Sequence, residues 1–294
     1  MSAFSLRRNT CRLCDAGDLE LVIPLAPTPL ADDYVPADRL GEVQETYPLD
    51  LFLCLGCGHL QLLDVLNPEV IFRDYLYETS TSLGLVAHFK RYAEEVMGRV
   101  HPPDGSFVVE IGSNDGSLLK SFQDGGMRVL GVDPARNIAQ RATASGVETL
   151  PAFFTAELAR KIKRERGAAA IVTANNVFAH ADNLGDMAEG VSELLAPDGV
   201  FVFEVAYLVD LIEKWLFDNI YHEHLCNHTV KPLRGFLRRH GMELTSIERV
   251  DTKGGSIRGF AKLASSSPEV SPSVDALVDL ETSLGFCYDL RDNR

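Results

Sequence analysis

The stretch between residues 107 and 263 alternates between short apolar runs and segments in which apolar residues recur at helical spacing. The runs are rich in Val and Ile and too short for helices, which is typical of buried strands. We expect strands near residues 107–111, 128–132, 148–150, 170–173, 200–205, 243–250 and 257–263. We expect helices between them near residues 117–123, 137–143, 156–166, 184–195, 207–217 and 231–240.

This alternation predicts an α/β fold with a mostly parallel sheet and helices on both of its faces. The last two strands are joined by a short turn that contains Gly254 and Gly255, so they should pair antiparallel. An amphipathic helix near residues 85–100 precedes the sheet, and one helix near residues 274–284 follows it. The pattern divides the chain into a first module at residues 1–68, a helical linker or lid at 69–105, the main domain at 106–264 and a short tail at 265–294.

The first strand of the main domain ends in Glu110 and runs into a glycine-spaced turn, G-S-N-D-G, at residues 112–116. Glycines let the backbone approach a ligand closely, and Asp133 at the tip of the second strand suits a ribose diol. A dinucleotide fold would want G-x-G-x-x-G, but Asn114 stands where the middle glycine should be. The E-x-G-x-x-x-G turn instead resembles the S-adenosylmethionine (SAM) methyltransferase pattern. NAD binding and a turn without a ligand are the alternatives.

Four of the six cysteines form two C-x-x-C pairs in the first module, namely Cys11 with Cys14 and Cys54 with Cys57. In a reducing compartment such pairs favour a metal site over a disulfide framework, and four thiolates complete the tetrahedral coordination of structural zinc. The module has short strands near residues 19–23, 49–53 and 60–62, and metal binding would supply the stability that its small core lacks. Redox-active thiols and unliganded cysteines are the alternatives.

The composition narrows the classes of protein that this chain can represent. Of its 294 residues 46% are hydrophobic and 24% are charged, which is ordinary for a globular protein. The net charge of −14 argues against non-specific binding to nucleic acid or to an anionic membrane. No secretory signal is visible at residues 1–10, and no apolar run approaches the roughly 18 residues that a membrane span needs. We expect a cytoplasmic protein with neither nucleic acid nor membrane as a partner.

The densest group of polar and aromatic residues lies at residues 219–228, after the fifth strand, where the carboxyl edge of an α/β sheet faces the ligand crevice. In an extended segment His222 and His224 would share one face, and Tyr221 and Glu223 would share the other. A base with a pKa near neutrality beside a carboxylate and a phenol suits proton abstraction. The alternatives are histidines with a structural role, or a metal site built from His222, His224, Cys226 and His228.

Three further side chains bear on this site. His180 follows the fourth strand and reaches the same edge of the sheet, so it becomes a second polar group opposite the Tyr221–His224 stretch. Tyr75 and Tyr77 lie just before the main domain. They either pack with the hydroxyl at the surface or form a lid over the site.

Several motifs, in order along the chain, resemble those of the sugar C-methyltransferase family. They are the two C-x-x-C pairs, D-Y-L-Y at residues 74–77, E-I-G-S-N-D-G at 110–116, N-N-V-F-A-H at 175–180, Y-H-E-H at 221–224 and G-G-S-I-R at 254–258. Members of this family use SAM to methylate a carbon beside the ketone of a nucleotide-linked 4-keto-deoxysugar. The resemblance implies a Rossmann-like SAM methyltransferase sheet, a small zinc-binding domain and a role in deoxysugar biosynthesis and secondary metabolism.

The resemblance also implies roles for individual residues. A structural Zn²⁺ would be held by Cys11, Cys14, Cys54 and Cys57. SAM would be bound by Glu110, Gly112, Asn114, Asp115, Gly116, Asp133, Pro134 and Asn176. The reacting centre would contain Tyr75, His180, Tyr221, Glu223 and His224. We expect His224 to act as the base, with Glu223 orienting it and with Tyr221 and His180 donating hydrogen bonds to an enolate oxygen.

Family members typically continue into a second Rossmann-like domain that helps grip the sugar nucleotide, whereas this chain ends at Arg294. We expect a nucleotide-sugar or related small-molecule substrate, and a partner chain is one way to supply the missing domain. The first alternative is O-methylation of a small molecule on the same scaffold. The others are a non-catalytic SAM- or sugar-binding partner, and a zinc-dependent nucleic-acid binder that the acidic charge balance disfavours.

Overall fold

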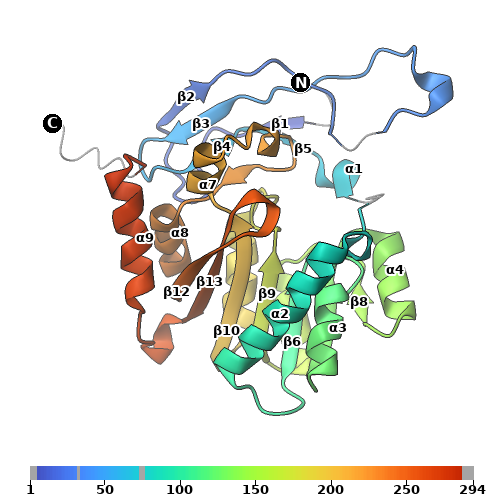
Figure 1. Ribbon diagram of the computed structural model, residues 1–294, viewed down its shortest axis with the longest axis vertical. Coiled ribbons are helices and arrows are strands. Elements are labelled where there is room, and N and C mark those ends of the chain that lie inside the picture. The colour runs from blue at the N-terminus through green and yellow to red at the C-terminus, as the bar shows by residue number, and fades with distance from the viewer. Residues whose placement is uncertain (1–4, 32–33, 73–76, 287–294) are drawn as a thin grey trace.

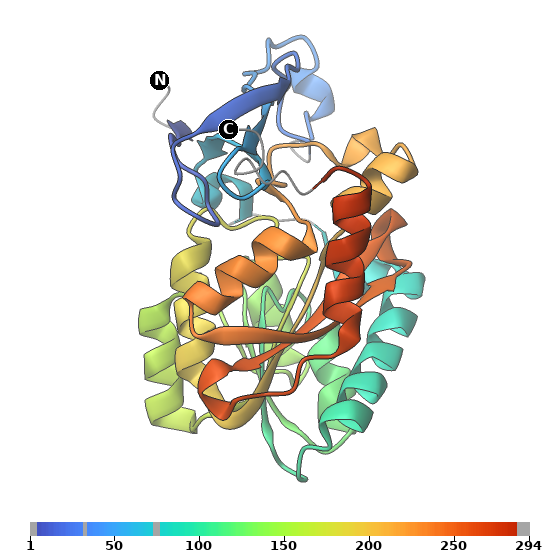
Figure 2. The same ribbon diagram turned by 90° about the vertical axis from the view of Figure 1, so that its left-hand side faces the viewer.

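A central seven-stranded sheet with helices on both faces carries a smaller sheeted module at one end (Figures 1 and 2). The computed structural model describes residues 5–31, 34–72 and 77–286. The strands of the central sheet are, in spatial order, β12 (Met242–Val250), β13 (Ser256–Leu263), β10 (Leu195–Ala206), β9 (Ala169–Asn175), β6 (Phe107–Ile111), β7 (Arg128–Val132) and β8 (Thr149–Leu150). The five strands from β10 to β8 run parallel, and β13 pairs antiparallel with both β10 and β12. The predicted α/β sheet with a final antiparallel pair is therefore confirmed.

Two helical layers cover the sheet. Successive residues of each strand point to opposite faces, and because both sets are apolar, both faces need a cover. Val108 and Ile171 pack with residues of α2 and α3, whereas their neighbours Val109 and Val172 pack with residues of α5, α6 and α8. The described helices are α1 (Pro68–Phe72), α2 (Leu83–Val100), α3 (Ser117–Asp124), α4 (Arg136–Ala144), α5 (Ala156–Arg166), α6 (Leu184–Leu194), α7 (Leu208–Glu213), α8 (Val230–Arg239) and α9 (Pro272–Ser283). None of these described helices is long and apolar enough to cross a membrane.

The N-terminal module is built around a four-stranded antiparallel sheet that borrows one strand from the main domain. Its strands are β11 (Cys226–Asn227), β4 (Leu60–Leu62), β3 (Leu51–Cys54) and β2 (Leu19–Ile23). A separate pair is formed by β1 (Ser5–Arg7) and β5 (Asp64–Leu66). Cys226 pairs with Gln61 and Asn227 with Leu60, and the backbone N–H of Leu62 donates to Leu225 O at 3.0 Å. The segment that carries the predicted chemistry is thus fixed to the module by backbone hydrogen bonds.

The chain after β10 departs from the single helix expected at residues 207–217. Helix α7 ends at Glu213, and Trp215 adopts a left-handed φ of 57°, which does not continue a helix. A 3₁₀ turn, η3 (Phe217–Asn219), follows and leads into the histidine-rich segment. This break redirects the chain toward β11.

The C-terminal helix α9 is tied to the sheet domain by one buried carboxylate. Glu281 is fully buried, and its Oε1 accepts hydrogen bonds from the Tyr207 hydroxyl at 3.0 Å and from the Val230 backbone N–H at 2.6 Å. Its Oε2 accepts from the Lys231 N–H at 3.1 Å. These N–H groups belong to the first turn of α8, where helices have unpaired donors. Glu281 therefore caps α8 from another helix.

We expect Glu281→Ala to lower the free energy of unfolding by about 2–4 kcal/mol, because it leaves three buried donors without an acceptor. Urea unfolding followed by circular dichroism measures the change. Asp279→Ala is the matched control, since Asp279 lies on the same helix and is exposed. Equal stability of the two variants would contradict the capping role.

Candidate functional site

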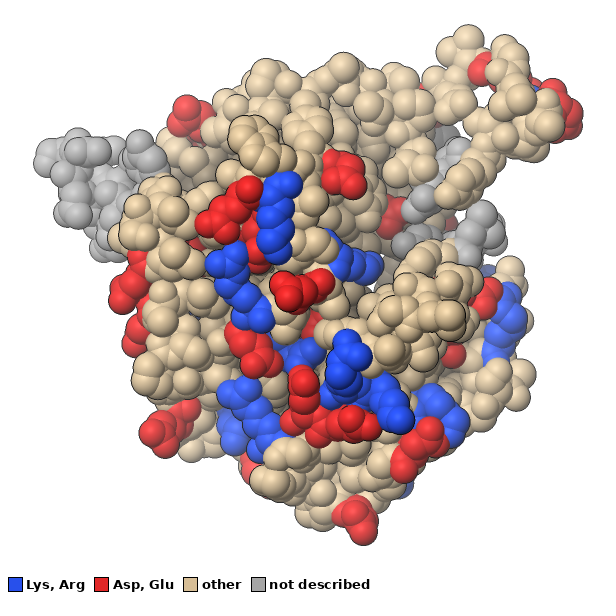
Figure 3. Space-filling model, in the orientation of Figure 1, with Lys and Arg blue, Asp and Glu red and all other residues tan. Residues whose placement is uncertain are grey.

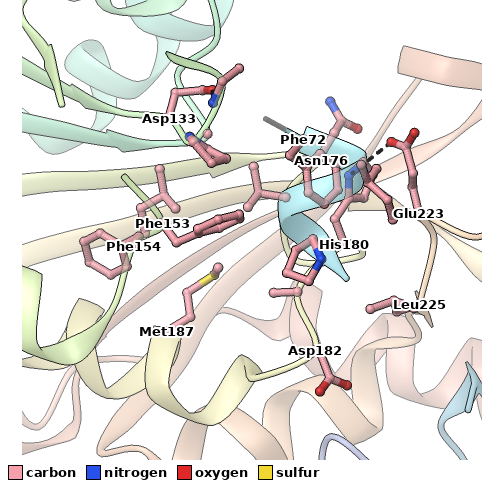
Figure 4. A pocket seen from close by; sticks show the side chains of 18 of the residues that line it. Phe72, Asp133, Phe153, Phe154, Asn176, His180, Asp182, Met187, Glu223 and Leu225 are labelled. Carbon is pink, nitrogen blue, oxygen red and sulfur yellow. Dashed lines mark hydrogen bonds and ion pairs between the residues drawn. The ribbon is translucent and has the colours of Figure 1, made fainter. Parts of the chain in front are cut away.

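A cavity of about 640 Å³ lies at the carboxyl ends of β6, β7 and β9, the edge where open α/β sheets bind ligands. Figure 4 shows Asp133, Phe153 and Phe154 toward one end and His180 and Glu223 toward the other. The predicted cofactor-binding residues that line it are Glu110, Gly112, Asn114, Asp133, Pro134 and Asn176. Asp115 and Gly116 shape the turn beside it.

The glycine turn allows the backbone to approach the cavity. Gly112 has φ 68°, and a Cβ there would lie 2.4 Å from Val177 Cγ2. Gly116 has φ 80° and precedes the first residue of α3. Only glycine adopts both conformations without strain or collision. The spacing of the two glycines is therefore a requirement of the turn itself.

Asn114 occupies the position where a dinucleotide fold has its middle glycine, and its side chain supports the segment above. Its Oδ1 accepts a hydrogen bond from the Thr79 backbone N–H at 2.9 Å, and its Nδ2 donates to Tyr77 O at 2.8 Å. Asp115 Oδ2 likewise accepts from the Ser80 N–H at 2.7 Å. Both side chains hold residues 77–80 over the turn. We therefore expect any ligand contact of Asn114 and Asp115 to come from their backbone groups.

Asp133, at the tip of β7, is buried and accepts two backbone hydrogen bonds. Its Oδ2 accepts from the Asn114 N–H at 2.8 Å and its Oδ1 from the Ala135 N–H at 2.9 Å. Burial raises the pKa of Asp133 above its ordinary value. Because each carboxylate oxygen has two lone pairs, both oxygens can still accept from a ligand hydroxyl. Asp133 thus links the glycine turn to the ligand-binding edge.

Polar atoms at the floor of the cavity fit a polar ligand. Glu110 Oε2, Ser113 Oγ and Asn175 Oδ1 are buried, and no hydrogen-bond partner for them exists within the described chain. Burial raises the pKa of Glu110 well above its ordinary value. Native proteins rarely leave such atoms unpaired, so a bound molecule with donor groups would satisfy them.

The histidine-rich segment forms a turn, which corrects the extended geometry considered from sequence. The His224 backbone N–H donates to Tyr221 O at 2.9 Å, so these two side chains lie together. His224 Nδ1 donates to Asn219 O at 2.7 Å, and the Tyr221 hydroxyl donates to His224 Nε2 at 2.9 Å. The Asn219 carbonyl therefore orients the imidazole in the role that we expected of Glu223. Burial lowers the pKa of His224 to about 4.

His180 joins this pair to the cavity. Its ring centroid lies 5.0 Å from that of His224 and 5.9 Å from that of Phe72, which stacks on it. His180 Nδ1 is 3.9 Å from Glu223 Oε2. Burial lowers the pKa of His180 well below its ordinary value, so the ring is neutral. The structure thus brings together four of the five side chains expected at the reacting centre, and the fifth, Tyr75, lies outside the described residues.

Lys253 is a further cavity residue that the sequence did not single out. It lines the cavity, and its Nζ lies 5.8 Å from the centroid of the Tyr77 ring. Burial lowers its pKa. In the sequence, its position directly before Gly254 and Gly255 was the one indication that it occupies a special turn. In the structure its φ is 48°.

The metal site considered for the histidine-rich segment is not formed. His222 Nε2 donates to Tyr47 O at 3.1 Å, and His228 Nε2 donates to Phe178 O at 3.1 Å. The two rings thus bind different segments from the one that holds His224. Within the described residues the single group of His, Cys, Asp and Glu side chains close enough to share an ion lies elsewhere. His228 therefore packs inside the interface between the module and the sheet, and His222 joins Tyr47 of the module to the cavity wall.

That group is the cysteine cluster of the N-terminal module. The four sulfurs of Cys11, Cys14, Cys54 and Cys57 all lie within 4.8 Å of one another. Two of the separations are 3.7 Å, between Cys11 and Cys57, and 3.5 Å, between Cys14 and Cys54. Zn–S bonds of about 2.3 Å in a tetrahedron place sulfurs about 3.8 Å apart, so the cluster fits zinc. With four thiolates the coordination sphere is closed, which indicates a structural metal.

Comparison with known proteins agrees with both parts of the structure. Residues 11–72 match the family described as "Putative zinc binding domain", and residues 85–247 match the family described as "Methyltransferase domain". The C-methyltransferase NovU of Streptomyces niveus is 38% identical over 278 residues, which make up 95% of this chain and 66% of NovU. The PH0226 protein of Pyrococcus horikoshii OT3 superposes with a TM-score of 0.51 at 14% identity, covering 67% of this chain and 96% of that one.

We expect purified protein to contain one Zn²⁺ per chain, measured by mass spectrometry of the metal. Cys54→Ser should lose the ion, because three thiolates leave the tetrahedral site incomplete. At free zinc 1,000-fold above Kd, losing the site removes about 4 kcal/mol of stability. Cys226→Ala is the control, since Cys226 is buried in β11 outside the cluster. Zinc retained in full by Cys54→Ser would refute this assignment.

Proposed function

This chain belongs to the methyltransferase-domain family and carries a zinc-binding domain before that domain, and we propose that it is a SAM-dependent C-methyltransferase. We further propose that the methyl acceptor is the carbon next to the ketone of a nucleotide-linked 4-keto-deoxysugar, in deoxysugar biosynthesis of secondary metabolism. The similarity to NovU, a C-methyltransferase, supports transfer to carbon. The chain spans 66% of the length of NovU. The observation that carries the proposal is the Tyr221–His224 pair, whose imidazole packs against His180, a residue that lines the cavity.

SAM, when bound, supplies the electrophilic methyl group, and the glycine-turn end of the cavity is suited to hold it. In this proposal the backbone of residues 112–116 and the side chains of Glu110, Asp133 and Asn176 bind the polar parts of SAM. Pro134 and the rings of Phe153 and Phe154 line the same end and fit an aromatic base. The unpaired buried atoms at the floor support this assignment.

The acceptor carbon requires a base, because a C–H beside a ketone is only weakly acidic. His224 Nε2 carries the lone pair of a neutral ring whose Nδ1 hydrogen is fixed by Asn219 O, and this lone pair accepts from the Tyr221 hydroxyl before substrate binds. At pH 7 this nitrogen is unprotonated because burial lowers the pKa of His224 to about 4. As the proton leaves carbon, negative charge develops nearby and favours the imidazolium, which raises that pKa during the step.

The developing enolate oxygen needs hydrogen-bond donors. In the proposed mechanism the Tyr221 hydroxyl turns from His224 Nε2 to this oxygen, which leaves the Nε2 lone pair free to take the proton. A ring N–H of His180 also donates to the oxygen. Glu223, 3.9 Å from His180 Nδ1, can fix which nitrogen of His180 carries the hydrogen. The carbon then attacks in line, which requires positioning rather than further proton transfer.

A transfer assay with SAM labelled at the methyl carbon and a thymidine-diphosphate 4-keto-6-deoxyhexose tests the function. We expect NMR of the product to place the label on a ring carbon beside the ketone. Label on oxygen would establish O-methylation on the same scaffold. SAM binding without transfer to any keto sugar would contradict the proposed enzyme activity.

His224→Ala should lower kcat by a factor on the order of 10² or more and leave the affinity for SAM unchanged. In the native enzyme the neutral ring is the active form, so kcat/KM should fall only as the pH drops toward about 4, well below the ordinary histidine value of 6.5. His101→Asn, at the exposed end of α2, is the control and should leave the rate unchanged. A native rate from His224→Ala would exclude His224 as the base.

A further inference from the structure

A second cavity, of about 660 Å³, adjoins the first. The two share the lining residues Tyr77, Leu85 and Lys253. We propose that the second cavity binds the diphosphate of a nucleotide-linked substrate, with Arg91 and Lys253 as its cationic ligands. This inference rests on the proposed function and names the site that would hold the anionic part of the substrate while the sugar lies in the first cavity.

The second cavity lies between α2 and the turn of the β12–β13 hairpin. Residues of α2, among them His88, Arg91 and Glu95, line one side, and residues 249–253 line the other. Figure 3 shows this face of the molecule, where basic side chains gather among acidic ones over α2 and the hairpin. Its cationic lining groups are Arg91, Arg249, Lys253 and Arg258, against Glu95 and Asp251 as acidic ones. This local excess of positive charge stands in a chain whose net charge is −14.

Two of the four cations are already neutralised. Arg249 pairs with Asp210 at 2.6 Å and with Glu213 at 3.1 Å. Arg258 pairs with Glu204 at 2.8 Å and with Glu95 at 2.6 Å. These contacts take up both guanidinium groups and one of the two lining carboxylates.

Arg91 and Lys253 remain, and neither has an ion pair within 4.0 Å in the described part of the chain. Two cations without partners beside one cavity match the two phosphate groups of a nucleoside diphosphate. A guanidinium can bind a phosphate through two parallel hydrogen bonds, and an ammonium binds it as a point charge. Against these two cations stands Asp251, the remaining lining carboxylate, so the unpaired lining groups keep a net positive charge that favours an anionic ligand over a neutral one.

Lys253 is held at the junction of the cavities by a constrained turn. Its φ of 48° is followed by φ values of 87° at Gly254 and 146° at Gly255. A Cβ would lie 2.3 Å from Leu216 Cδ1 at Gly254 and 2.4 Å from Asp210 Cβ at Gly255. A non-glycine residue in this conformation is strained, and strain of this kind is common where a side chain must be aimed at a ligand.

The Lys253 side chain is exposed, and partial desolvation by the groups around its ammonium lowers its pKa. Glu223 and Glu204 attract it, and the neutral rings of His180 and His224 lie on the same side of the site. A phosphate at the junction would add a directly paired anion beside this ammonium. The same contact would place the adjoining sugar toward His180.

Calorimetric titration with thymidine diphosphate, in the presence of SAM, tests the subsite on the full chain. We expect Lys253→Met and Arg91→Met each to weaken binding about tenfold or more, because each removes a charged hydrogen-bond partner. Affinity for SAM should stay unchanged, and Lys253→Arg should recover most of the loss. In turnover both Met variants should raise KM for the nucleotide sugar more than they lower kcat. Lys120→Met, an exposed cation on α3, is the control.

Thymidine without phosphates provides the second arm. It should bind far more weakly than thymidine diphosphate and equally to native protein and to both Met variants. Equal binding of thymidine diphosphate to all variants, or no binding to native protein, would overturn the subsite. Carbon methylation with unchanged KM in the variants would sustain the proposed function and remove this inference. Diphosphate binding that depends on Arg91 and Lys253, without methyl transfer, would support this subsite and contradict the proposed function.

Discussion

The pairing of β11 with β4 is the contact on which the position of the histidine-rich segment depends. Strand β4 belongs to the zinc module through its pairing with β3, and Cys54 and Cys57 lie at the turn between these strands. On its other edge β4 holds β11, which follows His224 after one residue, and the Leu62 N–H donates to Leu225 O at 3.0 Å. One metal-bound hairpin would therefore fix the strand into which the histidine turn runs.

Arg12 makes a second link, from between the two cysteines of the first C-x-x-C pair. Its buried side chain donates from Nε to Asp182 Oδ1 at 3.0 Å and from Nη1 to Gln61 Oε1 at 3.1 Å. Asp182 lies two residues after His180, so the loop that carries His180 is held by the same module as the turn that carries His224. The zinc module therefore contacts both segments that carry these two histidines, and so constrains the separation of the two rings.

The alternation of strands and helices and the cysteine pairs could be predicted from sequence because both are local patterns. The roles within the cavity depend on contacts between distant segments. Asn114 supports residues 77–80 with its side chain, and nothing in its own neighbourhood indicated this. The turn that joins Tyr221 to His224 was missed because the following strand belongs to a sheet more than 150 residues away in sequence. Lys253 reaches the cavity only when the hairpin folds over α2.

His224 and His228 are held in similar ways and differ in the side chains that surround them. His228 is fully buried and His224 half-buried, desolvation lowers the pKa of each to about 4, and each donates one N–H to a backbone carbonyl. His228 points its donor into the interface between the module and the sheet. His224 Nε2 instead accepts a hydrogen bond from the Tyr221 hydroxyl, and its ring contacts His180, which lines the cavity. Both histidines are therefore neutral and held by a backbone carbonyl, and contact with His180, which lines the cavity, is what sets His224 apart from His228.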